Sequence, residues 1–312
     1  MKYFFLFIVI SSFSQNLGNS PYTQYGIGDL TSESLQRPNQ MGEAGSASAS
    51  ANFINNLNPA LLAHNQYTTL DFGLAFKSRT LQSSANNGFS NGFNFVHGSM
   101  LLPITKWWSS MVCIKPFSSV NYTIEGTSRI ANDTSKTYDF TFKGKGGLTN
   151  FFWSNGFKLS KTLYVGLETA YIFGKTDDDF RSRVPNSNFD NVILKSGNSS
   201  HVRLKPGMVF RVSEYKKPTY FKNPEDSNIV SISGYTHSWV KKDSSYKPSG
   251  KSFAVGLTFE RFFNISTNQM TTLQKIDGND IAIVLDTINR NNFKMQLPSS
   301  LRLGLAYEKV GK

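Results

Sequence analysis

Histidine, serine and aspartate are the residues of this chain from which a hydrolytic site could be built. The histidines are few and widely spaced: His64, His97, His201 and His237. A hydrolase of the serine type needs a nucleophile, a histidine and an acid side by side. No spacing in the sequence indicates such a set. We therefore expect no catalytic residues and predict that the protein is not an enzyme.

Two further motifs contain residue types that bind ions. Asp177-Asp178-Asp179 could bind calcium, but it lacks the glycine and the distal glutamate of a calcium-binding loop. A solvated loop between two strands is the favoured interpretation. Gly144-Lys-Gly-Gly147 is not followed by a helical pattern, which a phosphate-binding loop requires, and it predicts a kink or turn. We expect no metal site and no cofactor.

The first 14 residues have the pattern of a secretion signal. Lys2 supplies the positive start, residues 3–10 (YFFLFIVI) form the apolar core, and Ser12 and Ser14 are the small residues before a cleavage site. The apolar core is much shorter than the roughly 20 residues of a membrane-spanning helix. The expected organisation is a signal peptide (1–14), an N-terminal hatch segment (15–65) and a strand region (66–312).

The strand region shows a two-residue period. Near its end, apolar and polar or small residues alternate: Leu301, Leu303, Leu305 and Tyr307 against Arg302, Gly304, Ala306 and Glu308. This period puts the two sets on opposite faces of a strand. About ten such runs, one of them at 228–241, follow a secretion signal in a chain with 14% aromatic residues. The pattern predicts an all-β fold, an antiparallel transmembrane β-barrel with lipid outside and a polar lumen inside.

Charged residues lie opposite the apolar faces of these strands. If the apolar faces contact lipid, the following charges point into the lumen: Asp71, Lys77, Glu168, Arg203, Lys205, Arg211, Glu260, Arg302 and Glu308. Because both signs occur, we expect ion pairs there. The net charge of +12 is scattered without a basic patch, so nucleic acid is not an expected partner, whereas outer-membrane lipid is.

Small residues dominate the N-terminal segment. The run 41–52 consists largely of Gly, Ala and Ser, and Asn58-Pro59 has the cap and first-turn residues that begin a helix. Small side chains permit close packing of a backbone against a wall. The segment therefore predicts a compact insert in the lumen, and a flexible Ser-rich tail is the alternative.

Three stretches resemble the FadL-like outer-membrane transporters in the form common among Bacteroidota. They are PYTQYGIGDL (21–30), MGEAGSASASANFINNLNPALLA (41–63) and LPSSLRLGLAY (297–307). The resemblance implies a 14-stranded barrel, so this chain, with about ten strands, would lack about four of them; a smaller complete barrel is the alternative. It also implies an N-terminal hatch, with these residues carried over from the family: Gly42, Gly45, Asn58, Pro59 and Ala60.

The resemblance implies passive uptake of hydrophobic compounds across the outer membrane of a Gram-negative cell, with a hydrophobic small molecule as ligand. The alternative is a PorV-like, non-transporting subunit of a type IX secretion or surface-assembly complex, with secretion-system proteins as partners. The fold does not decide between these functions. The sequence does not specify the ligand-binding residues.

Overall fold

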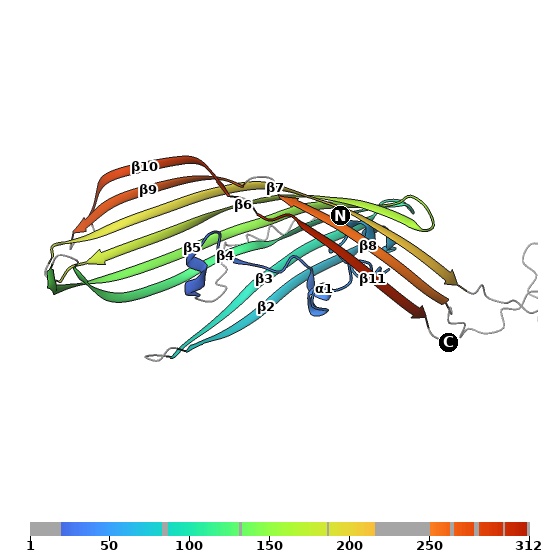
Figure 1. Cartoon of the computed structure of the whole chain (residues 1–312), viewed down its shortest axis with the longest axis horizontal. Helices are drawn as coiled ribbons and strands as arrows, with labels where there is room; N and C mark the ends of the chain where they lie inside the picture. The colour runs from blue at the N-terminus through green and yellow to red at the C-terminus, as the bar shows by residue number, and fades with distance from the viewer. Residues whose placement is uncertain are drawn as a thin grey trace, which may run out of the picture.

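The computed structural model describes residues 20–82, 87–130, 133–185, 187–215, 250–262, 265–277, 281–295 and 297–310 (Figure 1). The helices in these stretches are short: η1 (Pro21–Gln24), α1 (Gln36–Gln40) and η2 (Pro59–His64). None of the helices in the described stretches has the length and apolar character needed to cross a membrane. The predicted signal peptide (1–14) and the predicted strand at 228–241 lie outside the described residues.

All strands in the described residues belong to one antiparallel sheet of 11 strands, close to the predicted number. They are β1 (Asp29–Leu30), β2 (Thr69–Gln82), β3 (Asn87–Pro103), β4 (Trp108–Ile130), β5 (Asp133–Lys158), β6 (Leu163–Arg183), β7 (Phe189–Tyr215), β8 (Gly250–Phe262), β9 (Ile265–Asp277), β10 (Ala282–Met295) and β11 (Ser300–Val310). From β2 to β7, each strand pairs with the next one along the chain. The prediction of an all-β antiparallel fold is confirmed.

Strand β7 is long enough to pair with two strands along one edge. Its first half, Phe189–Ser200, pairs with β9, and its second half, Arg203–Tyr215, pairs with β8. Strand β10 then pairs with β9, and β11 pairs with β8. Strands β8 and β9 thus follow one another along β7, and β10 and β11 continue this arrangement at the sheet edge (Figure 1).

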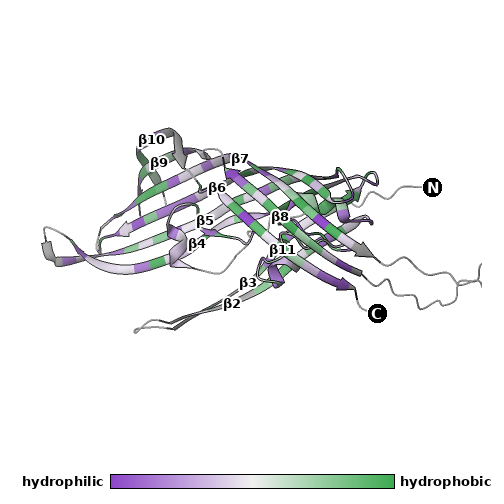
Figure 2. Cartoon of the chain, turned by 45° about the vertical axis from the view of Figure 1, so that its right-hand side comes forward, coloured by the Kyte–Doolittle hydropathy of each residue, from purple (hydrophilic) through white to green (hydrophobic). Residues whose placement is uncertain are grey.

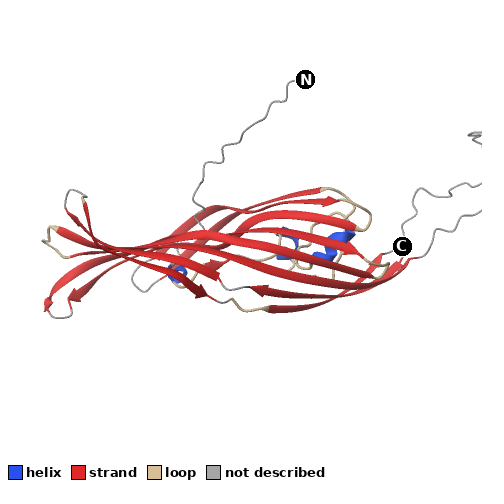
Figure 3. Cartoon of the chain, turned by 90° about the horizontal axis from the view of Figure 1, so that it is seen from above, coloured by secondary structure: helices blue, strands red, loops and turns tan. Residues whose placement is uncertain are grey.

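The sheet curves but does not close. In the described part of the chain, β2 forms one edge, β10 and β11 form the other, and no pairing joins the two edges. The three short helices lie within the curve of the strands when the molecule is seen from above (Figure 3). A closed barrel therefore stays a prediction.

Apolar side chains cover one face of the sheet and are exposed there. Along β11 the exposed apolar residues are Leu301, Leu303, Leu305 and Tyr307, each 63–70% exposed. Figure 2 shows hydrophobic residues alternating with hydrophilic ones along β8 and β11. The same face of β2 exposes Leu70, Phe72, Leu74 and Phe76, as the two-residue period predicts. The opposite face carries the N-terminal segment.

One local prediction was wrong, and a second was confirmed as a kink within a strand and not as a turn. Asp177-Asp178-Asp179 lies inside β6, not in a loop, because the aspartates pair across the sheet with lysine-containing β5: Asp177 lies opposite Lys145, and Asp179 lies opposite Lys143. Gly144-Lys-Gly-Gly147 does not end β5. Gly146 and Gly147 have φ angles of 119° and 149°, which only glycine adopts readily, so the strand distorts there while its pairing with β4 and β6 continues.

Candidate functional site

A row of glycines crosses the face of the sheet that carries the N-terminal segment. Gly156 of β5 lies opposite Gly166 of β6, which lies opposite Gly207 of β7. On the adjoining strands, Gly256 of β8 lies opposite Gly304 of β11. Because neither set carries a side chain, the sheet offers a flat strip of bare backbone across five strands.

The N-terminal segment occupies this strip at backbone contact distance. A Cβ atom added to Gly166 would lie 2.4 Å from the backbone N of Ala60. One added to Gly156 would lie 2.7 Å from the carbonyl O of Pro59, and one added to Gly256 would lie 2.3 Å from the carbonyl O of Ser46. Contacts this short exclude any side chain at these positions. The small residues of the segment and the glycines of the sheet therefore form one close-packed interface.

Asn58 joins the segment to the sheet by hydrogen bonds. Its Oδ1 accepts from the backbone N–H of Ala60 and so caps η2. Its Nδ2 donates to the carbonyl O of Ser46 within the segment and to that of Met208 in β7, both at 3.1 Å. Asn58 and Ala60 are fully buried, and Pro59 between them is buried as well. One amide thus fixes the start of η2 and its position on β7.

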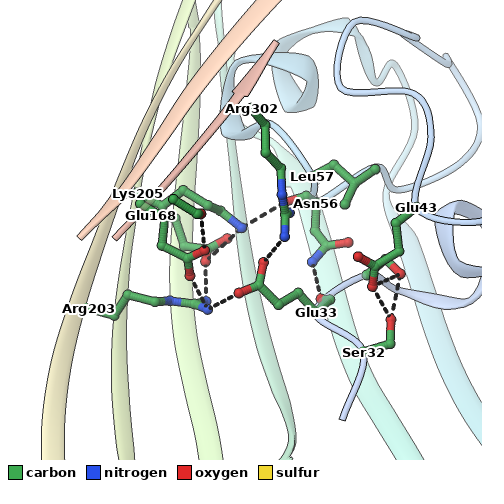
Figure 4. A network of polar contacts seen from close by, with 12 residues as sticks. Ser32, Glu33, Glu43, Asn56, Leu57, Glu168, Arg203, Lys205 and Arg302 are labelled. Carbon is green, nitrogen blue, oxygen red and sulfur yellow. Dashed lines mark hydrogen bonds and ion pairs between the residues drawn. The ribbon is translucent and has the colours of Figure 1, made fainter. Parts of the chain in front are cut away.

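Besides Asn58, positively charged side chains of the strands also bind the N-terminal segment (Figure 4). Lys115 of β4 donates through Nζ to the carbonyl groups of Ser32 and Ser34. Lys205 of β7 donates through Nζ to the carbonyl O of Asn56 at 3.1 Å. Both lysines are buried, with 3% and 2% of their surface exposed. Buried ammonium groups need such partners, so these lysines tie the segment to two separate strands.

Glu33 places a carboxylate of the N-terminal segment at the centre of this network. Its Oε1 lies 3.5 Å from Nη1 of Arg203, and its Oε2 lies 2.9 Å from Nη2 of Arg302. Arg203 also donates to Glu260 at 2.7 Å and to Glu168 at 2.6 Å (Figure 4). The cluster therefore links strands β6, β7, β8 and β11 to the N-terminal segment through hydrogen-bonded ion pairs.

These charges control the ionisation of Glu33. Burial alone would raise the pKa of Glu33, but Lys205, Arg203, a hydrogen bond with Glu260, and Arg302 together lower it to about 2. Because the folded pKa lies below the unfolded value of about 4.3, the unfolded chain binds the proton more readily. The stabilisation from Glu33 is thus fully present above pH ~4.3 and is lost as the pH falls toward 2.

The pH dependence of stability tests this assignment. We expect Glu33→Gln to lower the free energy of unfolding above pH ~4.3, and the difference from wild type to shrink as the pH falls toward 2. Denaturant titrations of both proteins across this range measure the difference. Glu125→Gln, which changes an exposed glutamate of β4, is the control. A difference for Glu33→Gln that does not change with pH would contradict the ion-pair role.

The comparison with protein families decides where this chain belongs. The model of the BamG family matches residues 1–312, the whole of the sequence. The chain belongs to the BamG family. No curated protein and no solved structure matches the sequence.

Membership in the BamG family corrects the FadL-like resemblance. The stretches 21–30, 41–63 and 297–307 do not identify a FadL-like transporter, and the predicted uptake of hydrophobic compounds is wrong. The PorV-like alternative has no support from the family match either. The physical reason lies in the motif: a run of small residues ending in Asn-Pro-Ala is what close packing on a glycine strip and capping of η2 require. It is not specific to one family.

The structure of this BamG-family chain separates the charges predicted for a lumen into three groups. Glu168, Arg203, Lys205, Glu260 and Arg302 meet around Glu33. Arg211 and Glu308 form a second pair at 2.6 Å, and Asp71 lies 3.2 Å from His97. The side chain of Lys77 lies outside the described residues.

The predicted hatch residues of the BamG-family chain also have different positions. Asn58, Pro59 and Ala60 contact the glycine strip. Gly42 and Gly45 do not contact it; they form turns of the segment with φ angles of 66° and 109°. Sequence reasoning missed Glu33, Asn56 and Lys115. The signal for Lys115 was available, because this single charge interrupts the apolar run 111–117 of β4.

No metal site is indicated in this part of the BamG-family chain. Within the described residues, no group of three or more His, Cys, Asp or Glu side chains is placed to hold a metal ion. The acidic residues of the cluster instead contact arginine and lysine. That the protein has no cofactor and is not an enzyme stays a prediction.

Proposed function

We propose that this protein is an outer-membrane subunit of the BAM machinery, which assembles outer-membrane proteins. The observation that carries the proposal is the match of the BamG family model over the whole chain. Its partners would then be proteins of that machinery. In this role the curved sheet is a wall set in the membrane, and the N-terminal segment is a fixed part of its inner surface.

The outer face of the sheet supports a membrane location. Directly paired residues form an apolar row across five strands: Phe157, Val165, Met208, Leu257 and Leu303. Along β6 the apolar band runs from Leu163 to Phe173, which agrees with the roughly 9–11 residues of a transmembrane strand. Beyond Phe173 the same face changes to Lys175, Asp177 and Asp179. This change from apolar to charged matches a boundary between lipid and water.

The fixed N-terminal segment favours a role in protein contact. Hydrogen bonds of Asn58, Lys115 and Lys205 hold the segment on β4 and β7, and Glu168, Arg203 and Glu260 beside Glu33 are buried. Releasing the segment would take the carbonyl partners from buried Lys115 and one carboxylate from buried Arg203, and breaking one buried pair costs about 3–5 kcal/mol. A wall with a fixed inner surface suits a subunit that presents a stable shape to other proteins.

Affinity purification from outer membranes tests the function. The full chain, tagged and extracted in mild detergent, is expected to co-purify with the central barrel subunit of the BAM machinery. Its depletion is expected to lower the amounts of other outer-membrane proteins. An outer-membrane protein with the same tag but a different function is the control. Recovery of the chain alone, together with unchanged outer-membrane protein levels after depletion, would refute the proposal.

A further inference from the structure

Two short turns lie next to each other at one end of the apolar band. The turn 104–107 joins β3 to β4, and the turn 159–162 joins β5 to β6. The backbone N–H of Lys158 donates to the carbonyl O of Trp107 at 2.8 Å, so the two turns are held side by side. Their side chains therefore form one continuous surface at the rim of the sheet.

This rim is positively charged. The stretches 103–108 and 157–163 contain Lys106, Lys158 and Lys161 and no acidic residue. All three lysines are exposed. We call these three residues the lysine rim. With no carboxylate in either stretch, the charges are left to attract an anion from outside the sheet.

A cleft opens beside the lysine rim. It has a volume of about 640 Å³ and is lined by Lys106, Lys158, Tyr164 and the end of η2, and none of the residues that line it is acidic. The Nζ atom of Lys158 lies 5.8 Å from the centre of the Tyr164 ring. His64, at the end of η2, also lines the cleft. Burial, followed by the charges of Arg211 and Lys158, lowers the pKa of His64 to about 4.

Apolar and aromatic side chains continue from the apolar band into the same two turns. Ile104, Trp107 and Leu159 are 48%, 54% and 63% exposed. The rings of Trp107, Trp108 and Phe157 stack with centroids 6.1–6.3 Å apart. Stacked aromatic rings next to lysines are typical of the level at which lipid headgroups meet acyl chains.

The opposite boundary of the band differs in charge. There Lys175 forms an ion pair with Asp177 at 3.0 Å, and Lys143 and Lys145 lie opposite aspartates of β6. Lysines at that boundary have acidic neighbours on the protein itself. The two ends of the band therefore differ: among the described residues, the end with the lysine rim combines two turns that carry lysine but no acidic residue, a cleft and an aromatic stack.

We propose that the lysine rim and its cleft bind the headgroups of anionic phospholipids in the leaflet at this end of the sheet. The phosphate would lie at the rim beside Lys106 and Lys158, and the acyl chains would pass over the rim along Trp107 and Leu159 onto the apolar band on the other face of the sheet. The site would fix how deeply this end sits in the membrane. This inference rests on the membrane location in the proposed function.

Competition between two lipids tests the site. The full chain in mild detergent is offered phosphatidylglycerol and phosphatidylcholine, and native mass spectrometry measures which lipid it retains. Wild type is expected to prefer phosphatidylglycerol. Replacing all three rim lysines by glutamine is expected to reduce this preference about 100-fold, as the loss of three lysine contacts with an anionic surface predicts. The matched variant with Lys143, Lys145 and Lys175 replaced by glutamine is expected to keep it.

The outcomes separate this site from the membrane proposal. Equal retention of both lipids by wild type, or loss of preference in both triple variants, would overturn the lipid site. Full displacement of phosphatidylglycerol by inorganic phosphate would also overturn it, because acyl contacts would then contribute nothing. A shift in gel mobility on boiling reports the folded sheet in each variant, and Lys106→Gln and Lys158→Gln serve as single variants if the triple variant does not fold. Wild type that fails to insert into phosphatidylcholine vesicles would instead contradict the membrane location itself.

Discussion

Gly166→Ala is expected to displace the N-terminal segment from the sheet. The new Cβ atom would lie 2.4 Å from the backbone N of Ala60 and from the carbonyl C of Pro59. Backbone atoms cannot rotate away as a side chain can, so either η2 or β6 must move. Overpacking of this kind costs about 1–3 kcal/mol, and here it also strains the hydrogen bonds of Asn58 to Ala60 and Met208. Limited proteolysis is expected to cleave within residues 20–66 of the variant much faster than in wild type.

Gly197→Ala is the matched control for this variant. Gly197 lies in β7 on the same face of the sheet, but a Cβ atom there would meet nothing closer than 3.4 Å, the hydroxyl of Thr176. Both changes remove a strand glycine, so they share the effect on the unfolded chain. Equal protease resistance of both variants would show that the segment does not press on β6. A faster cleavage of Gly197→Ala would indicate that strand glycines matter for another reason.

The alternation of apolar and polar side chains along the strands was predictable, because the two faces of a strand lie in different environments and so differ in residue type at every second position. Leu301 to Tyr307 and Leu70 to Phe76 show this in the sequence, and the structure exposes those side chains on one face. The charges on the other face were equally visible. What the sequence did not contain was their pairing, because Glu168, Arg203 and Glu260 come from strands whose register depends on the whole sheet. Strand β9 leaves no clear two-residue period in the sequence, because polar residues interrupt its apolar ones.

The position of the N-terminal segment on the sheet could be predicted only in part. The small residues of 41–52 and the cap at Asn58 indicate a segment that packs closely, and the structure packs it onto the sheet. Its counterpart is a set of single glycines, one each in β5, β6, β7, β8 and β11, and they become a strip only after the strands align. In a single strand such a glycine indicates a bulge or a locally less stable strand. Glu33 was missed for a similar reason, because it lies in a polar, turn-rich stretch where a charge normally faces water.

Replacing Arg203 by methionine is expected to cause the largest loss of stability of any single charge change in this cluster. Arg203 is 2% exposed and donates to Glu260 at 2.7 Å and to Glu168 at 2.6 Å. Methionine fills a similar volume but leaves both carboxylates buried with fewer partners. Breaking one side of a buried ion pair costs about 3–5 kcal/mol. Denaturant unfolding of the detergent-solubilised protein, followed by tryptophan fluorescence, measures this loss.

Arg302→Met provides the comparison, because Arg302 contacts the same Glu33 but keeps 29% of its side chain exposed. Exposed pairs contribute about 1 kcal/mol or less, so this variant is expected to lose far less stability than Arg203→Met. Arg203→Lys is expected to restore little, since an ammonium group cannot reach two carboxylates in the forked geometry of a guanidinium. Equal losses for Arg203→Met and Arg302→Met would mean that the cluster is not a buried anchor. Full recovery in Arg203→Lys would mean that charge alone, without hydrogen-bond geometry, holds β6, β8 and the N-terminal segment together.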